Sequence, residues 1–226
     1  MAKLVFHEEA NRQLEGGVSD VVLFPMTSGS YDTGVAWDGV TGITENPSGA
    51  DITDLYADDE KYASLQAAEK FGFGIEAFRS PPEFDACDGS ETVNGVSFGQ
   101  QSRKPFGLVY KTKIGDANHP GLDAGYKLNI IYNSLEQPSS RSYATINENP
   151  DAMSMSWDAN STPTKVTTLK ADGTPYKSVS KITLNSIEMK KKNKGDKLEE
   201  IEAMIYGDTN SDPTLPTPDQ ILAKIQ

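Results

Sequence analysis

The chain has 226 residues, 36% of them hydrophobic, and a formal net charge of −12. The length allows one large domain or two small ones, but the hydrophobic content is low for a compact monomer. We therefore expect a thin architecture, long polar loops, or a core completed by neighbouring subunits. The acidity disfavours general nucleic-acid binding, which depends on Lys and Arg that neutralise phosphates. No apolar run approaches the length of a membrane span.

The first part of the chain predicts a strand followed by a long loop. Residues 18–26 are typical of a strand that ends near Pro25. From 27 to 55, Gly, Ser, Thr and Asp recur and the apolar residues are too scattered for a helix, which favours a loop. Loops of this length are usually functional or disordered until partnered. Residues 61–70 have the composition of a short helix.

Strand patterns dominate the middle of the chain. Residues 71–78 alternate, with Phe71, Phe73, Ile75 and Ala77 on one face. A helical turn is expected within 80–90, with Phe84 and Cys87 directed inward. Further strands are predicted at 106–114, 125–132, 152–159, 164–171 and 180–187, separated by turn sequences. The pattern predicts a mainly β (α+β) fold: a β-sandwich or partial barrel with one flanking helix.

The flanking helix is expected near the C-terminus. Asp196 and Glu199 have the spacing of a capping box. Apolar residues then recur on one side, at Leu198, Ile201 and Ile205, and Gly207 ends the helix. A second short helix is predicted to begin at Thr217-Pro218.

Sequence motifs give little support for catalysis or for a metal. GFGIEA (72–77) matches a dinucleotide fingerprint but lacks the preceding apolar strand and following helix, so it favours a strand with close-packed glycines. DTNSDPTLPTPD (208–219) places oxygen ligands at EF-hand positions but has Pro213 where the loop needs glycine. His7 and His119 have no metal-ligand spacing, and Cys87 has no nearby histidine that would mark a nucleophile. We expect no catalytic residue, metal or cofactor.

Two charged segments are candidates for contacts with neighbours. The stretch 51–64 carries five carboxylates and two tyrosines, and could bind a metal, form a solvated loop, or form a repulsive or subunit-contacting surface. Its candidate residues are Asp51, Asp54, Tyr56, Asp58, Asp59 and Glu60. The basic run 189–197 is either a solvated turn or a contact for an acidic neighbour. Its candidate residues are Lys190, Lys191, Lys192 and Lys194.

The order of several segments resembles one family. The segments are GVAWDGVTGITENPSGAD, TDLYADDEKYAS, IEAFRSPPEFDACDGS, GVSFGQQSRKPFGLVYKTKIGD, GYKLNIIYNSLEQPSSRSYATINENPDAMSMSWD and LPTPDQILAKI. Read together from about residue 20 to the end, they are similar to the major tail protein, or tail tube protein, of siphophages of Gram-positive bacteria. Two departures are local: SPPEF replaces a more usual Y-P-D-E-F, and residues 188–196 are richer in lysine.

The resemblance implies a structural subunit without catalysis. Six copies would form a ring with one continuous inner β-barrel, and rings would stack into a tube through which double-stranded DNA passes. One domain would span 1–226, with an N-terminal arm at 1–17, a long stacking loop at 27–62 and a C-terminal arm with a short helix at 207–226. An acidic channel would avoid retaining DNA.

The same resemblance implies the partners and the location. Expected partners are other copies, a tape-measure protein, a tail-terminator protein and distal tail proteins, with no membrane. The protein would be made in the host bacterial cytoplasm and end in the virion tail. The alternative is a β-sandwich binding or adhesion module of a phage baseplate or surface structure, which would stay monomeric and carry a concave aromatic patch.

Overall fold

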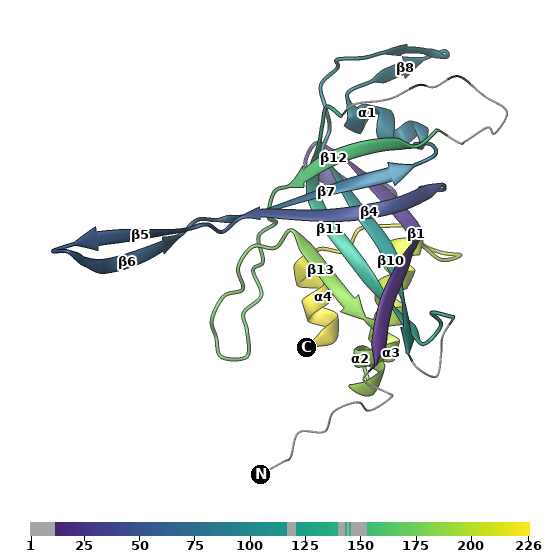
Figure 1. The fold of residues 1–226 in the computed structure, drawn as a ribbon. Helices are drawn as coiled ribbons and strands as arrows, with labels where there is room; N and C mark the ends of the chain where they lie inside the picture. The colour runs from purple at the N-terminus through teal and green to yellow at the C-terminus, as the bar shows by residue number, and fades with distance from the viewer. Residues whose placement is uncertain (1–11, 117–120, 140–142, 144, 146–152) are drawn as a thin grey trace.

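A computed structural model describes residues 12–116, 121–139, 143, 145 and 153–226. It shows a large antiparallel sheet that folds over on itself, with short helices against one face (Figure 1). The predicted mainly β fold, a sandwich with a flanking helix, is confirmed. Two hairpins extend beyond the packed body, one at the left of the view and one at its top (Figure 1).

The back layer of the sandwich is built on three long strands and one short one. These are β1 (Gln13–Thr27), β10 (Phe106–Asp116), β11 (Gly125–Gln137) and β13 (Lys181–Asn185), with β2 (Ser30–Tyr31) and β3 (Val35–Ala36) beside β1. All their pairings are antiparallel. Strands β10 and β11 are buried on both faces because the front layer covers one face and the helices cover the other.

The front layer consists of β4 (Val40–Gly49), β7 (Glu69–Ala77) and β12 (Met155–Ser161). It joins the back layer through β11, whose first half pairs with β13 and whose second half pairs with β12. The predicted alternation of β7 is confirmed, because Phe73, Ile75 and Ala77 are buried while Glu76 between them is exposed. Strand β4 forms the edge of this layer, because it pairs only with β7 in the described sheet.

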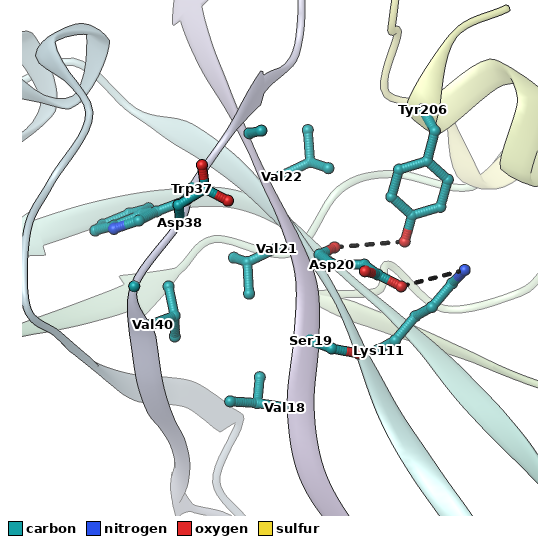
Figure 2. A pocket seen from close by; sticks show the side chains of 12 residues that line it. Val18, Ser19, Asp20, Val21, Val22, Trp37, Asp38, Val40, Lys111 and Tyr206 are labelled. Carbon is teal, nitrogen blue, oxygen red and sulfur yellow. Dashed lines mark hydrogen bonds and ion pairs between the residues drawn. The ribbon is translucent and has the colours of Figure 1, made fainter. Parts of the chain in front are cut away.

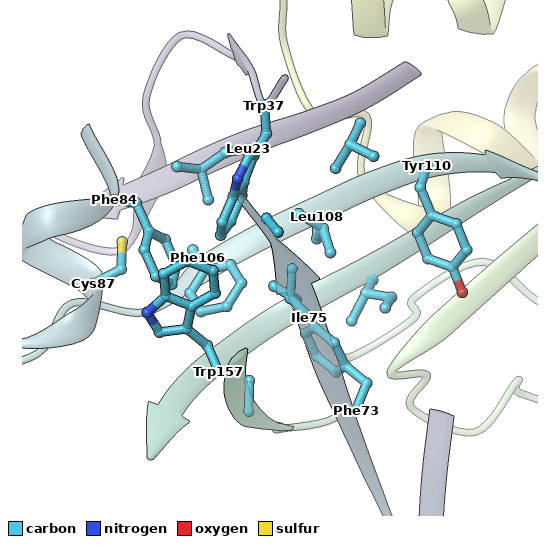
Figure 3. Close-up of a cluster of buried hydrophobic side chains, with 14 residues drawn as sticks. Leu23, Trp37, Phe73, Ile75, Phe84, Cys87, Phe106, Leu108, Tyr110 and Trp157 are labelled. Atoms are coloured by element: carbon cyan, nitrogen blue, oxygen red, sulfur yellow. The ribbon is translucent and has the colours of Figure 1, made fainter. Parts of the chain in front are cut away.

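Aromatic side chains fill the space between the layers (Figure 3). Phe84 lies at their centre, with its ring centroid 4.6 Å from that of Trp37 and 5.5 Å from those of Phe106 and Trp157. The short helices η2 (Pro82–Phe84) and α1 (Asp85–Asp88) hold Phe84 and Cys87 fully buried, as predicted.

Three helices cover the other face of the back layer: α2 (Ser186–Lys191), α3 (Gly195–Tyr206) and α4 (Pro218–Ile225). The predicted apolar face of α3 is confirmed, because Leu198, Ile201 and Ile205 pack against buried residues of β10, β11 and β13. Gly207 ends α3 at a φ of 75°. The predicted capping box of α3 is wrong, since its N-cap is Lys194 and no side chain caps it. Helix α4 carries one instead, between Thr217 and Gln220.

Three other expectations about secondary structure are wrong. The 27–55 region holds β2, β3, β4 and the start of a hairpin, so it is not a loop. Residues 61–70 form strand instead of helix. The 164–171 region makes only isolated bridges, at Thr164 and Leu169. The strand predicted at 152–159 begins at Met155 in the described part of the chain.

The two predicted terminal arms differ from expectation. Residues 1–11 lie outside the described residues, and β1 already begins at Gln13. The 207–226 segment contains the predicted short helix but lies against its own chain. The backbone N–H of Gly34 donates to the carbonyl of Pro213 at 3.0 Å, and the Tyr132 hydroxyl donates to the carbonyl of Pro216 at 2.9 Å. This segment is therefore part of the body.

Candidate self-assembly surface

A hairpin formed by β5 (Ile52–Ala57) and β6 (Glu60–Gln66), which we call the arm, is exposed along almost its whole length. The ladder between β4 and β7 runs to the Gly49–Glu69 pair, and the arm continues from that end away from the body (Figure 1). Every residue of β5 is exposed. The 27–62 segment, expected to be a loop, thus contains β2, β3, β4 and most of a protruding hairpin that reaches residue 66, and its role in stacking stays a prediction.

The acidic residues of 51–64 are spread along the arm. Asp58 and Asp59 form its two-residue turn, with φ angles of 51° and 62°. A tight hairpin turn of this type requires left-handed backbone at both positions, and the short polar side chain of Asp tolerates it. Glu60 follows directly. These three carboxylates form the tip of the arm, and they have no hydrogen bond or ion pair among the described residues.

Asp54 belongs to a cross-strand network within the arm. Its carboxylate accepts a hydrogen bond of 2.7 Å from the Ser64 hydroxyl and lies 2.8 Å from the Lys61 ammonium. The bond from Lys61, and then that from Ser64, lowers the pKa of Asp54. Asp51 lies at the base, where its carbonyl accepts from Ala67. The structure therefore places the candidate residues along one hairpin and not around one point.

Large apolar side chains on the arm are open to solvent. Tyr56 and Tyr62, near the tip, are 70% and 78% exposed, and Ile52 is 67% exposed. Leu55 and Leu65 are also exposed and share one face of the hairpin. A two-stranded hairpin is marginally stable alone, and grouped exposed apolar side chains mark interaction sites. The arm therefore has the properties of a surface that another chain covers.

The predicted basic patch lies at the end of α2 and in the turn before α3. Lys190, Lys191 and Lys192 are exposed and Lys194 is half-buried. Lys191 pairs with Glu188 at 3.0 Å, while the other three have no ion pair among the residues that the structure describes. Cations are favourable in the last turn of α2, at Lys190 and Lys191, because the C-terminal end of a helix carries partial negative charge.

A hollow of about 330 Å³ adjoins this basic patch. Leu184 of β13, Met189 of α2 and Ile225 of α4 contribute apolar walls. The charged residues at the same hollow are Lys192, Lys194 and Glu188. The elements that line the hollow, β13, α2 and α4, lie in the lower part of the view, whereas the arm extends to the left (Figure 1).

A second hollow, of about 430 Å³, lies between β1 and the chain around β3 and β4 (Figure 2). Lys111 lies at its border, with its ammonium 2.8 Å from Glu202, 3.6 Å from Asp20, and 4.7 Å from the ring centroids of Tyr126 and Tyr206. Burial, followed by the charge of Asp20, raises the pKa of Tyr206. These contacts neutralise the lysine and hold α3 against β10 and β1.

The 208–219 segment uses its carboxylates in two separate interactions. Asp208 accepts hydrogen bonds from the backbone of Asn210 and Ser211. Asp219 accepts from the backbone N–H and hydroxyl groups of Thr167 and Thr168, and the bonds from Thr168 are the main cause that lowers the pKa of Asp219 to about 2. Among the described residues no group of three or more His, Cys, Asp or Glu side chains converges as metal ligands do.

The glycine motif at 72–77 and Cys87 lie in closely packed parts of the fold. A Cβ at Gly72 would lie 2.9 Å from the Asn160 side chain, so the prediction of a strand with close-packed glycines is confirmed. Burial raises the pKa of the Cys87 thiol to about 12. His7 and His119 lie outside the described residues.

Sequence reasoning missed a second exposed hairpin, formed by β8 (Glu91–Val93) and β9 (Val96–Phe98). Val93, Val96 and Phe98 are each about half exposed and share one face. The sequence contains a signal for this hairpin, because Asn94-Gly95 is the dipeptide most typical of a tight hairpin turn.

Comparisons with known proteins identify no relative: no protein-family model and no curated protein matches the sequence. Within the part of the chain that the structure describes, no helix combines the length and apolar character needed to cross a membrane.

Proposed function

We propose that this protein is the structural subunit of a siphophage tail tube, in which hexameric rings stack into a hollow tube for DNA passage. The arm is the observation that supports this proposal most. It extends a two-layer β body by a hairpin with exposed tyrosines and leucines, and none of its residues belongs to either buried core. A projecting element of this kind serves contact between copies better than it serves the stability of one copy.

The edges of the sheet support ring formation. Strands β4 and β13 each pair with a single neighbour in the described sheet, so each leaves one row of backbone groups for another chain. Exposed edges in a stable protein are usually protected, and closure into a barrel removes them. A ring of copies joined along these edges gives the continuous inner barrel that the resemblance implies.

The charge balance supports a conduit for DNA. The net charge of −12 disfavours retention of a polyanion. Within this proposal the tube contacts a tape-measure protein inside, and tail-terminator and distal tail proteins at its ends. No catalytic step is required of any residue.

A binding or adhesion module of a baseplate or surface structure is the second candidate. The observation that favours it is the apolar face of the β8–β9 hairpin, formed by Val93, Val96 and Phe98. Such a module binds through this face while remaining monomeric.

Negative-stain electron microscopy of the purified protein at rising concentration separates the two functions. Tubes or six-fold rings are expected from the tail tube protein. A monodisperse monomer at high concentration, with no ring under any salt condition, would contradict the tube and favour the binding module.

A further inference from the structure

We propose that the outer part of the arm docks on a second copy of this chain, at the hollow between β13, α2 and α4 with its lysines. This inference rests on the proposed function, because it names the surface that receives the arm in the assembly. It joins the two charged segments into one contact: Asp58, Asp59 and Glu60 on one copy, and Lys190, Lys192 and Lys194 on the next.

The arm reaches the hollow only on another copy. It leaves the body at the open end of the β4–β7 ladder and points away from it, whereas α2 and β13 lie in the lower part of the body (Figure 1). Its cross-strand ladder from Ile52–Gln66 to Ala57–Glu60 keeps it extended. The tip therefore presents its charges to a neighbour.

The two surfaces match in charge. The tip carries three carboxylates, and the receiving surface carries three lysines without an ion pair among the described residues. The one carboxylate that lines the hollow, Glu188, is paired with Lys191, so the net charge of the surface stays positive. Opposite charges that meet across an interface speed association and fix its orientation, while like charges reject the wrong orientation. A tip-to-tip contact is disfavoured for that reason.

The outer part of the arm and the hollow also match in polarity and size. Tyr56 and Tyr62 lie next to the tip and are mostly exposed, and each combines an apolar ring with a polar hydroxyl. The hollow combines apolar walls from Leu184, Met189 and Ile225 with a polar border. Ligand pockets have volumes of roughly 300–1,000 Å³, so a hollow of about 330 Å³ accepts an aromatic side chain.

The contact is head-to-tail, because the donor surface and the receiving surface differ. Such contacts either close into a ring or continue without limit. Each copy donates one arm and offers one hollow, so every copy in a stack is equivalent. This is the geometry that rings need to stack.

Charge reversal tests the pairing. One variant carries Asp58→Lys and Asp59→Lys, a second carries Lys190→Glu and Lys192→Glu, and a third carries all four changes. Lys191 is left in place to keep its pair with Glu188. Each of the first two variants is expected to lose tubes in electron microscopy, and the third to regain them. The matched control reverses two exposed carboxylates elsewhere, Glu83→Lys and Glu199→Lys, and is expected to assemble.

The outcomes separate this inference from the proposed function. If wild-type protein forms tubes and the first two variants also do, the docking is wrong and the tube stands. The same holds if the combined variant fails to regain tubes. Circular dichroism checks that each variant is folded.

Cysteine crosslinking tests the contact even if the wild-type protein forms no tubes. Chains with Asp59→Cys are mixed with chains with Lys192→Cys under mild oxidation; Cys87 is buried and does not compete. Disulfide-linked dimers are expected in the mixture and not from either chain alone. An Asp59→Cys and Glu83→Cys mixture is the control, since Glu83 is exposed, belongs to η2 and does not line the hollow. Equal crosslinking in both mixtures, or none in either, would overturn the docking.

Discussion

The hydroxyl of Tyr110 donates a hydrogen bond of 2.5 Å to Oε1 of Glu45, which links β10 of the back layer to β4 of the front layer. The Lys181 ammonium of β13 contacts the same carboxylate oxygen. Tyr110 is only 3% exposed, and burial, with the hydrogen bond to Glu45, raises its pKa. One carboxylate at the edge of the front layer thus holds three strands in place.

Replacement of Tyr110 by Phe tests this link. The change keeps the ring and removes one hydrogen bond to a charged group, which costs about 2 kcal/mol. Urea unfolding at pH 7 measures the free energy of unfolding. Tyr62→Phe on the arm is the control and is expected to change nothing, because Tyr62 is 78% exposed. Equal stability of Tyr110→Phe and wild type would show that the hydrogen bond contributes nothing net.

The role of the arm is tested by its removal. Residues 50–68 are replaced with Asn-Gly, which joins the paired residues Gly49 and Glu69 through a tight turn. The free energy of unfolding is expected to stay within about 0.5 kcal/mol of wild type, as for surface changes, since neither core contains an arm residue. Tubes are expected to disappear.

A second variant distinguishes the arm from the other hairpin. Val93→Ser with Phe98→Ser removes exposed apolar groups from β8–β9 and leaves the arm unchanged. We expect this variant to assemble normally. Normal assembly of the armless chain, or loss of assembly in the β8–β9 variant, would mean that the wrong hairpin has been assigned to the contact.

The sequence predicted those strands and helices whose residue pattern is recognisable within a single segment. Strands β10 and β11 are rich in β-branched and aromatic residues, and α3 repeats its apolar residues with helical spacing between Lys194 and Gly207. It did not predict β4, because Pro47 and its Gly, Asn and Ser neighbours are typical of turns. These residues form a strand because β7 pairs with them, and Pro47 is tolerated since β4 has only one partner. That pairing is tertiary and leaves no local signal.

The candidate surface was predictable in part. The charges of 51–64 and of the lysine run left contacts between copies open as one alternative beside a solvated loop or turn. The place of 51–64 on a protruding arm could not be predicted. Both faces of the arm are exposed, so its strands lack the alternation that half-burial imposes. The hollow could not be predicted either, because it forms where Leu184, Met189 and Ile225 meet from three elements.

Asp219 is expected to make stability depend on pH. Its pKa in the folded chain is about 2, below the ordinary value of 3.8, because Thr168 and Thr167 donate to its charged form. The folded state therefore binds fewer protons, and the contribution of Asp219 is complete above about pH 4 and lost as the pH falls toward 2. Asp219→Asn should unfold more easily than wild type at pH 7, and the difference should shrink between pH 4 and pH 2.

Urea unfolding across this pH range measures that difference. Asp212→Asn is the matched control, since Asp212 is exposed and makes no hydrogen bond among the described residues. A constant difference between wild type and Asp219→Asn at all pH values would show that the Thr167 and Thr168 contacts do not favour the charged carboxylate.

Chelation tests whether the 208–219 segment depends on calcium. The carboxylates of Asp208 and Asp219 already accept hydrogen bonds from Asn210, Ser211, Thr167 and Thr168. A calcium ion requires six to eight oxygen ligands that converge on one point, and these two carboxylates serve separate loops. Tubes treated with EDTA should therefore keep their length in electron micrographs. Dissolution in EDTA, with recovery on addition of calcium and not of magnesium, would show that an ion holds this segment.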